Sequence, residues 1–190
     1  PRTWEDMEEI APVLNEKGIV PFGVAAKSKA EVGRFISALS CMMYGLEFRD
    51  ALASKEINWD SEQCKALVEQ FKKFIDGGVL DPDAVSYEVQ DTISLFEQEK
   101  VAMMYTASYH FDRFQEMPFS EDIVCMNFPS FKDKPEYKDI WIASASEGFM
   151  ISAQPGTKEF DAACKLLAFM LSAETFKGYA EVNGGGAFPV

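Results

Sequence analysis

Residues 96–110 constrain the fold of this chain more than any other stretch, because they join three kinds of local structure. An amphipathic helix ends in a charged turn, and the apolar run Val101–Tyr105 then has the length and composition of a buried strand. A loop of small polar residues follows, with Ser108, Tyr109 and His110 at its end. An α/β sheet presents ligand-binding groups in this way, since the loop at the carboxyl end of a strand faces a crevice.

The composition indicates a globular protein with a substantial core. The chain has 190 residues, of which 47% are hydrophobic and 13% aromatic, and a net charge of −13. That charge argues against nucleic acid and anionic membranes as partners, because both require basic surfaces. No apolar run approaches the roughly 18 residues that span a bilayer. The start at Pro1, inside a helix N-terminus, favours a piece of a longer protein.

The cysteines are widely spaced and histidine is rare. Cys41, Cys64, Cys125 and Cys164 form no C-x-x-C pair, and His110 is the single histidine. The spacing argues against a zinc site and favours four reduced, buried thiols over disulfides. His110 has no evident nucleophile or orienting partner in the sequence, so we expect a polar loop histidine rather than a general base. The sequence predicts no enzyme activity, no metal and no cofactor.

Hydrophobic periodicity and capping signals predict an α/β protein that is rich in helices and has a short mixed sheet. The predicted helices start near Thr3, Ser28, Asp60 or Ser61, Ser86, residue 108, Thr157 and Ala173. The predicted strands are Val20–Val24, Val101–Tyr105, Ile123–Phe128, Ile140–Ala143 and Phe149–Ser152. Residues 46–58 fit either a helix or a loop. Residues 129–139 contain two prolines and alternating charges, and they are the best candidate for a linker.

Candidate ligand-binding residues lie in the loops of this pattern. Tyr109 offers an aromatic face for stacking, and the adjacent Ser108 offers a hydroxyl for hydrogen bonds. His110 belongs to the same loop. The other candidates follow the first strand or lie in the turn before Phe149, and they are Lys27, Ser28, Ser146 and Glu147.

Several segments, taken in order, resemble a known family. They are the "F-x-x-x-K-V-A-M" run over 96–103, the "P-x-T-W-[DE]-[DE]" start at 1–6, the helix over 57–82 that ends in a "G-x-x-x-P" turn, the strand and helix over 146–174, and the closing G-A-F-P-V. Their order and spacing resemble bacterial extracellular solute-binding proteins of sugar ABC importers, in the maltose-binding-protein class.

The resemblance implies one lobe of a two-lobe, periplasmic-binding-protein-like (type II) architecture. Residues 1–128 would form the carboxyl-side lobe, 129–139 a hinge crossing, and 140–190 a return segment that belongs to the other lobe. It also implies a carbohydrate ligand, permease subunits of an ABC transporter as partners, and an extracellular lipoprotein or a periplasmic protein. Because the amino-terminal half of the other lobe would be missing, we expect the return segment to fold back on the carboxyl-side lobe or the fragment to self-associate.

The sequence departs from the family pattern at two places. Relatives often have an acidic or aromatic residue after the first strand, where this chain has Ala25, Ala26 and Lys27, and Tyr109 stands where tryptophan is frequent. Both departures leave the identity of the sugar open. Two other interpretations remain: a non-catalytic lobe of an α/β hydrolase or transferase whose active residues lie outside this fragment, and a purely structural interaction domain.

Overall fold

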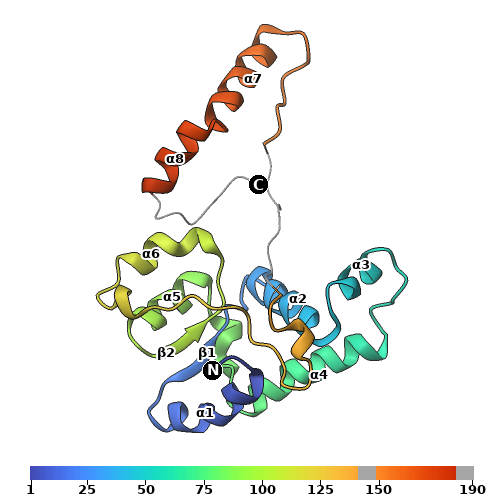
Figure 1. The fold of residues 1–190 in the computed structure, drawn as a ribbon, viewed down its shortest axis with the longest axis vertical. Helices are drawn as coiled ribbons and strands as arrows, with labels where there is room; N and C mark the ends of the chain where they lie inside the picture. The colour runs from blue at the N-terminus through green and yellow to red at the C-terminus, as the bar shows by residue number, and fades with distance from the viewer. Residues whose placement is uncertain (141–148, 183–190) are drawn as a thin grey trace. The chain divides into compact units, whose positions relative to one another are not determined.

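A computed structural model describes residues 1–140 and 149–182, and these fall into two compact units. The first unit holds 1–106 and 125–140, and the second holds 107–124 and 149–182. The first contains α1 (Trp4–Glu16), β1 (Val20–Gly23), α2 (Ala30–Tyr44), α3 (Glu47–Ala53), α4 (Glu62–Asp76), a 3₁₀ turn (Pro82–Ser86), α5 (Val89–Glu97), β2 (Val101–Met104) and a 3₁₀ turn (Pro135–Tyr137) (Figure 1). The second contains a 3₁₀ turn (Ser108–His110), α6 (Phe111–Gln115), a 3₁₀ turn (Ser120–Asp122), α7 (Lys158–Met170) and α8 (Ala173–Val182).

The sheet of the first unit is small and its strands are parallel. Val20 pairs with Val101, and Gly23 pairs with Met104 at the other end of the ladder. Leu80 adds a parallel bridge on the free edge of β1. Helix α1 contacts β1 and helix α5 contacts β2, as Figure 1 shows. Because the strands are parallel, their carboxyl ends meet at one edge of the sheet, and the loops that follow them start there.

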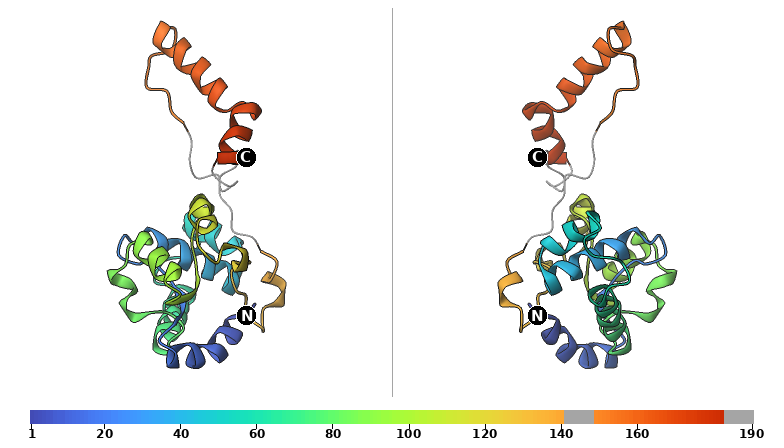
Figure 2. Two further views of the ribbon diagram at one scale, coloured as in Figure 1. Left: turned by 90° about the vertical axis from the view of Figure 1, so that its left-hand side faces the viewer. Right: turned by 90° about the vertical axis from the view of Figure 1, so that its right-hand side faces the viewer.

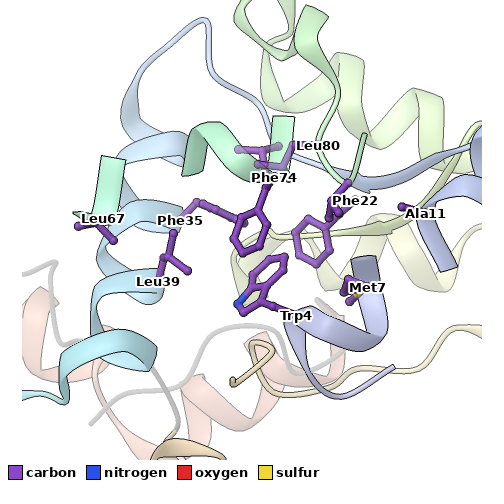
Figure 3. Close-up of a cluster of buried hydrophobic side chains, with 11 residues drawn as sticks. Trp4, Met7, Ala11, Phe22, Phe35, Leu39, Leu67, Phe74 and Leu80 are labelled. Atoms are coloured by element: carbon purple, nitrogen blue, oxygen red, sulfur yellow. The ribbon is translucent and has the colours of Figure 1, made fainter. Parts of the chain in front are cut away.

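The core of the first unit is built around one tryptophan. The fully buried Trp4 stacks on Phe74 with 4.2 Å between ring centroids, and Phe22, Phe35 and Phe128 surround it at 5.5, 5.8 and 5.3 Å. Figure 3 shows the side chains of Trp4, Phe22, Phe35 and Phe74 gathering from several elements. Aromatic pairs at such separations add to the stabilisation from area burial. Trp4 therefore joins α1, β1, α2 and α4 into a single core.

The start of α1 has the predicted capping box, and a distant segment binds to it. Thr3 accepts a hydrogen bond from the backbone of Asp6, and the Asp6 carboxylate accepts one from the backbone of Thr3. The backbone N–H of Trp4 donates to the carbonyl of Ser130 at 2.9 Å, and Lys132 pairs with Asp6 at 2.8 Å. Figure 2 shows the orange segment that follows Ser130 passing beside the N-terminus. The predicted linker over 129–139 thus packs against α1, while its role as a hinge stays a prediction.

Most predicted helices are confirmed. Ser61 caps α4 through a hydrogen bond from Cys64, and Thr157 caps α7 in the same way through Phe160. Helix α2 begins two residues after the predicted Ser28. The undecided stretch 46–58 contains the short helix α3.

Three local predictions are wrong. Residues Ile123–Phe128 form no strand: Phe128 packs into the core, but Val124 and Met126 are exposed, so the apolar residues do not share one face. Phe149–Ser152 likewise has an irregular backbone, and most of the predicted strand Ile140–Ala143 lies outside the described residues. Ser86 ends a 3₁₀ turn instead of opening a helix, because Tyr87 is extended and the capping box of α5 starts at Glu88.

The thiol prediction is confirmed only in part. All four cysteines are free, and Cys41 and Cys64 are buried. Cys125 is exposed and Cys164 is half-buried, because the segment over 123–128 is not a core strand and α7 has no fully buried residue. Among the described residues, no helix is both long and apolar enough to cross a membrane.

Candidate functional site

The loop after β2 presents the predicted aromatic platform. It ends in the 3₁₀ turn Ser108–His110, which is closed by a hydrogen bond from the backbone of His110 to the carbonyl of Ala107. Ser108 is exposed, Tyr109 is 50% exposed, and His110 is half-buried. The Tyr109 and His110 rings lie 4.5 Å apart at an angle of 56°. The turn thus brings three of the predicted residues together and leaves much of the Tyr109 side chain accessible.

Lys27 and Ser28 follow β1 in the first unit. Val24 and Ala25 continue from β1 as buried residues, and both Lys27 and Ser28 are exposed. The backbone of Lys27 donates to the carbonyl of Tyr87, and the Lys27 ammonium lies 3.7 Å from the carboxylate of Glu88. An exposed ion pair of this kind contributes little stability, so the ammonium can exchange one partner for another.

The remaining predicted residues, Ser146 and Glu147, lie outside the described residues. The described candidates form two groups that belong to different units, with Lys27 and Ser28 in the first and the Ser108–His110 turn in the second.

The sequence analysis missed a buried carboxylate on the first turn of α2. Glu31 is only 4% exposed, and one of its oxygens accepts a hydrogen bond from Arg34. Its other oxygen, Oε2, has no hydrogen-bond partner. Nothing in the sequence could have shown this, because an acidic residue on the first turn of a helix is expected to complement the helix dipole at the surface.

Tyr105, directly after β2, lies near this carboxylate. Burial raises the pKa of the Tyr105 phenol, and the charge of Glu31 raises the pKa further while Arg34 opposes the shift. The Tyr105 ring meets Phe35 and Phe128 edge-on, at centroid distances of 6.0 and 5.4 Å. The carboxyl edge of the sheet therefore holds an aromatic cluster with ionisable groups beside it.

A hollow lies between α1 and α4. It has a volume of about 520 Å³ and is lined by Glu8, Glu69, Lys72, Lys73, Asp76 and Gly77. Lys73 pairs with Glu8 at 3.0 Å, and Lys72 pairs with Asp76. Because these charges compensate one another and the hollow contains no aromatic side chain, it is a poor site for a small organic solute.

The fold of the first unit, with parallel strands between helices, is that of a periplasmic-binding-protein-like lobe. Three solved structures share it. A chitin oligosaccharide binding protein matches with a TM-score of 0.77 at 19% identity, over 97% of this chain and 46% of its own. A sugar transporter from Bacillus licheniformis in complex with stachyose matches with a TM-score of 0.67 at 18% identity, over 96% of this chain and 48% of its own.

The third structure is the bacterial solute receptor AcbH, described as preferring β-D-galactopyranose exclusively, with a TM-score of 0.64 at 20% identity, over 73% of this chain and 34% of its own. This chain belongs to the bacterial extracellular solute-binding protein family, whose model matches residues 1–175. It spans half or less of the length of the three matched structures.

Proposed function

We propose that this chain is about half of a two-lobe receptor that captures a carbohydrate in an interlobe cleft and delivers it to the permease of an ABC importer. The observation that carries the proposal is the agreement among the matched structures. All three are named for a glycan ligand, namely galactopyranose, chitin oligosaccharide or stachyose, and the chain belongs to a family of solute-binding proteins.

In this proposal residues 1–128 are most of the carboxyl-side lobe, 129–139 are the hinge crossing, and 140–190 return to the other lobe. The surface of α7 supports the assignment. Leu166 and Phe169 are 59% and 66% exposed, and α7 has no fully buried residue. Exposed apolar surface of this kind marks an interface, and the remainder of a two-lobe receptor would cover it.

Tyr109 is the proposed stacking platform for a sugar ring, because its ring is accessible and sits on a turn anchored by β2. Ser108 and His110 would hydrogen-bond hydroxyl groups of the same sugar. Lys27 and Ser28 would line the edge after β1, and Ser146 and Glu147 would contribute from the return segment. These side chains orient a ligand without supplying a nucleophile–base pair, so the proposed receptor is not an enzyme.

The localisation follows from the family, whose members are described as extracellular. We propose that the receptor works outside the cytoplasmic membrane, either as an anchored lipoprotein or in a periplasm, where it can meet its permease.

A titration of the full-length receptor tests this function. Calorimetry with a panel that includes stachyose, chitin oligosaccharides and galactose is expected to show saturable binding of at least one glycan. Mass spectrometry of the recovered glycan is expected to show it unchanged. Turnover of the glycan into a product would instead support the hydrolase or transferase alternative, and the absence of any glycan binding would refute a sugar receptor.

A further inference from the structure

Phe128 anchors the segment over 128–137 in the aromatic core of the first unit. Its ring meets three others edge-on, with centroid distances of 5.1 Å to Phe35, 5.3 Å to Trp4 and 5.4 Å to Tyr105. These rings belong to α2, to α1 and to the residue that directly follows β2. Because such aromatic pairs add to the stabilisation from area burial, the start of the segment is held by the same contacts as the core.

The backbone that follows Phe128 pairs with the start of α1. The N–H of Trp4 donates to the carbonyl of Ser130 at 2.9 Å, and the N–H of Ser130 donates to the carbonyl of Arg2 at 3.3 Å. Ser130 is buried, so breaking these hydrogen bonds without another partner would be costly. The ring of the next residue, Phe131, stacks on Phe74 at a centroid distance of 6.5 Å.

A charged contact then joins Lys132 to the first turn of α1. The backbone N–H of Lys132 donates to both carboxylate oxygens of Glu5, at 3.2 and 3.1 Å. Its ammonium lies 2.8 Å from the carboxylate of Asp6, which also accepts the hydrogen bond from the backbone of Thr3. Since the Lys132 side chain is largely exposed, these contacts fix the position of the segment more than they stabilise the fold.

Consecutive turns carry the segment from Lys132 to the end of α2. The N–H of Lys134 donates to the carbonyl of Phe131 at 3.1 Å, and the N–H of Tyr137 donates to the carbonyl of Lys134 at 3.2 Å. Tyr137 packs over Gly45, the residue that caps α2, because a Cβ added there would lie 3.3 Å from Cε1 and 3.4 Å from Oη of Tyr137. The segment is therefore fixed at both ends.

The two prolines of the segment also fit a fixed element better than a hinge. Pro129 lies between the anchors Phe128 and Ser130, and Pro135 begins the 3₁₀ turn that ends at Tyr137. Proline holds its own φ angle near a single value and reduces the conformational freedom of the chain. Both prolines thus restrict the backbone where a hinge would require freedom.

We propose that residues 128–137 form a strap that moves as part of the carboxyl-side lobe, so that the chain bends only beyond Tyr137. This inference rests on the proposed function, which assigns 129–139 to a hinge crossing, and it locates the motion at the end of that crossing. Hinge motion is absorbed by a few residues whose backbone angles can change. A bend within the strap would instead break its contacts to α1, to α2 or to the aromatic core.

Hydrogen exchange of the full-length receptor, measured by mass spectrometry, tests where the chain bends. Exchange is recorded without ligand and with saturating stachyose, chitotetraose or galactose. Because the strap keeps its contacts when the lobes close, a bound glycan should change the exchange rates over 128–137 by less than about twofold. Residues that follow Tyr137 should change by about fivefold or more, since their backbone takes up the motion.

Two variants of the ligand-free receptor test the anchors. Lys132→Met removes the ion pair with Asp6 and keeps most of the side-chain volume, and Tyr137→Ala removes the ring over Gly45. Each should raise the exchange rates of the strap about two- to fivefold, the scale of a partly exposed contact. Lys138→Met makes the same chemical change at an exposed position just beyond the strap, and it should match wild type.

Three results would overturn the strap and leave the receptor function intact. They are a bound glycan that changes exchange across 128–137, a bound glycan that leaves exchange beyond Tyr137 unchanged, or strap exchange in Lys132→Met and Tyr137→Ala equal to that in Lys138→Met. If wild type bound none of the three glycans, the proposed function would fail and the assigned bend with it.

Discussion

Replacing Trp4 by alanine tests the core on which the candidate site rests. Trp4 is fully buried and contacts four aromatic rings at centroid distances between 4.2 and 5.8 Å. Truncating a buried tryptophan to alanine costs about 3–5 kcal/mol, the sum of lost transfer free energy and a residual cavity. The upper half of this range applies here, because the rings around Trp4 belong to several helices and strands. These elements cannot all move inward to fill the cavity that the missing side chain leaves. Domains of this size are typically stable by about 5–15 kcal/mol, so the loss is a large share of the total.

Trp59 provides a matched control, since it is 78% exposed in the loop between α3 and α4. Trp59→Ala should change the free energy of unfolding by about 0.5 kcal/mol or less. Urea unfolding followed by far-ultraviolet circular dichroism measures both variants without relying on tryptophan fluorescence. A cost below about 1.5 kcal/mol for Trp4→Ala, or equal costs for the two variants, would show that Trp4 does not hold the core together.

Three further predictions concern the site, the segment that binds α1, and the sheet. In calorimetry on the full-length receptor, Tyr109→Ala should weaken glycan binding by roughly 1–3 kcal/mol. Thermal stability should change little, because a half-exposed ring contributes less to the core than to binding. Binding as tight as that of wild type would reject the stacking role. The hydrogen bond from Lys132, followed by that from the backbone of Arg2, holds the pKa of Asp6 well below its usual range. The Asp6 carboxylate therefore stabilises the folded chain at pH values above its unfolded pKa, and that stabilisation is lost as the pH falls through its lower folded pKa. Asp6→Asn should lower the thermal unfolding temperature at pH 7, by an amount that shrinks below about pH 4. A difference in unfolding temperature that stays constant with pH would contradict this. Gly23→Ala should destabilise the protein by about 1–3 kcal/mol in urea unfolding, because the added Cβ would lie 2.8 Å from Cγ1 of Val101 in β2. An unchanged midpoint of the urea transition would show that the two strands can move apart to accommodate the methyl group.

The helices were predictable from the sequence because their signals are local. The capping box of Thr3 and Asp6, the cap at Ser61 and the cap at Thr157 each involve residues within one turn of one another. Such hydrogen bonds depend little on the rest of the fold, so the residues themselves are enough to locate the helix starts.

The strand predicted over Ile123–Phe128 failed because a strand needs a neighbouring strand, which a run of apolar residues does not guarantee. The backbone of the adjacent Ser130 instead bonds to the start of α1, more than a hundred residues away in the chain. The segment over 129–139 looked like a linker because of its prolines and alternating charges. The long-range backbone pairing is the reason that it packs against α1 instead.

The exposure of Tyr109 was predictable because residue type and loop position agree, while its role in binding stays a prediction. Tyr109 follows a predicted strand and is exposed, as an aromatic platform should be. Glu31 was missed because its burial depends on tertiary packing at the carboxyl edge of the sheet. A helix-start glutamate in solvent and one enclosed beside Tyr105 have the same local sequence, and only the fold distinguishes them.

A comparison of two affinities tests the central claim, that this chain is one part of a two-lobe glycan receptor. Calorimetry with the same glycan would be carried out on the full-length receptor and on the 190-residue chain. Because one wall of a cleft provides about half of the contacts and never encloses the solute, we predict micromolar affinity for the full receptor and millimolar or undetectable affinity for this chain. Micromolar affinity of the 190-residue chain for any glycan, together with a monomer in light scattering, would contradict this account.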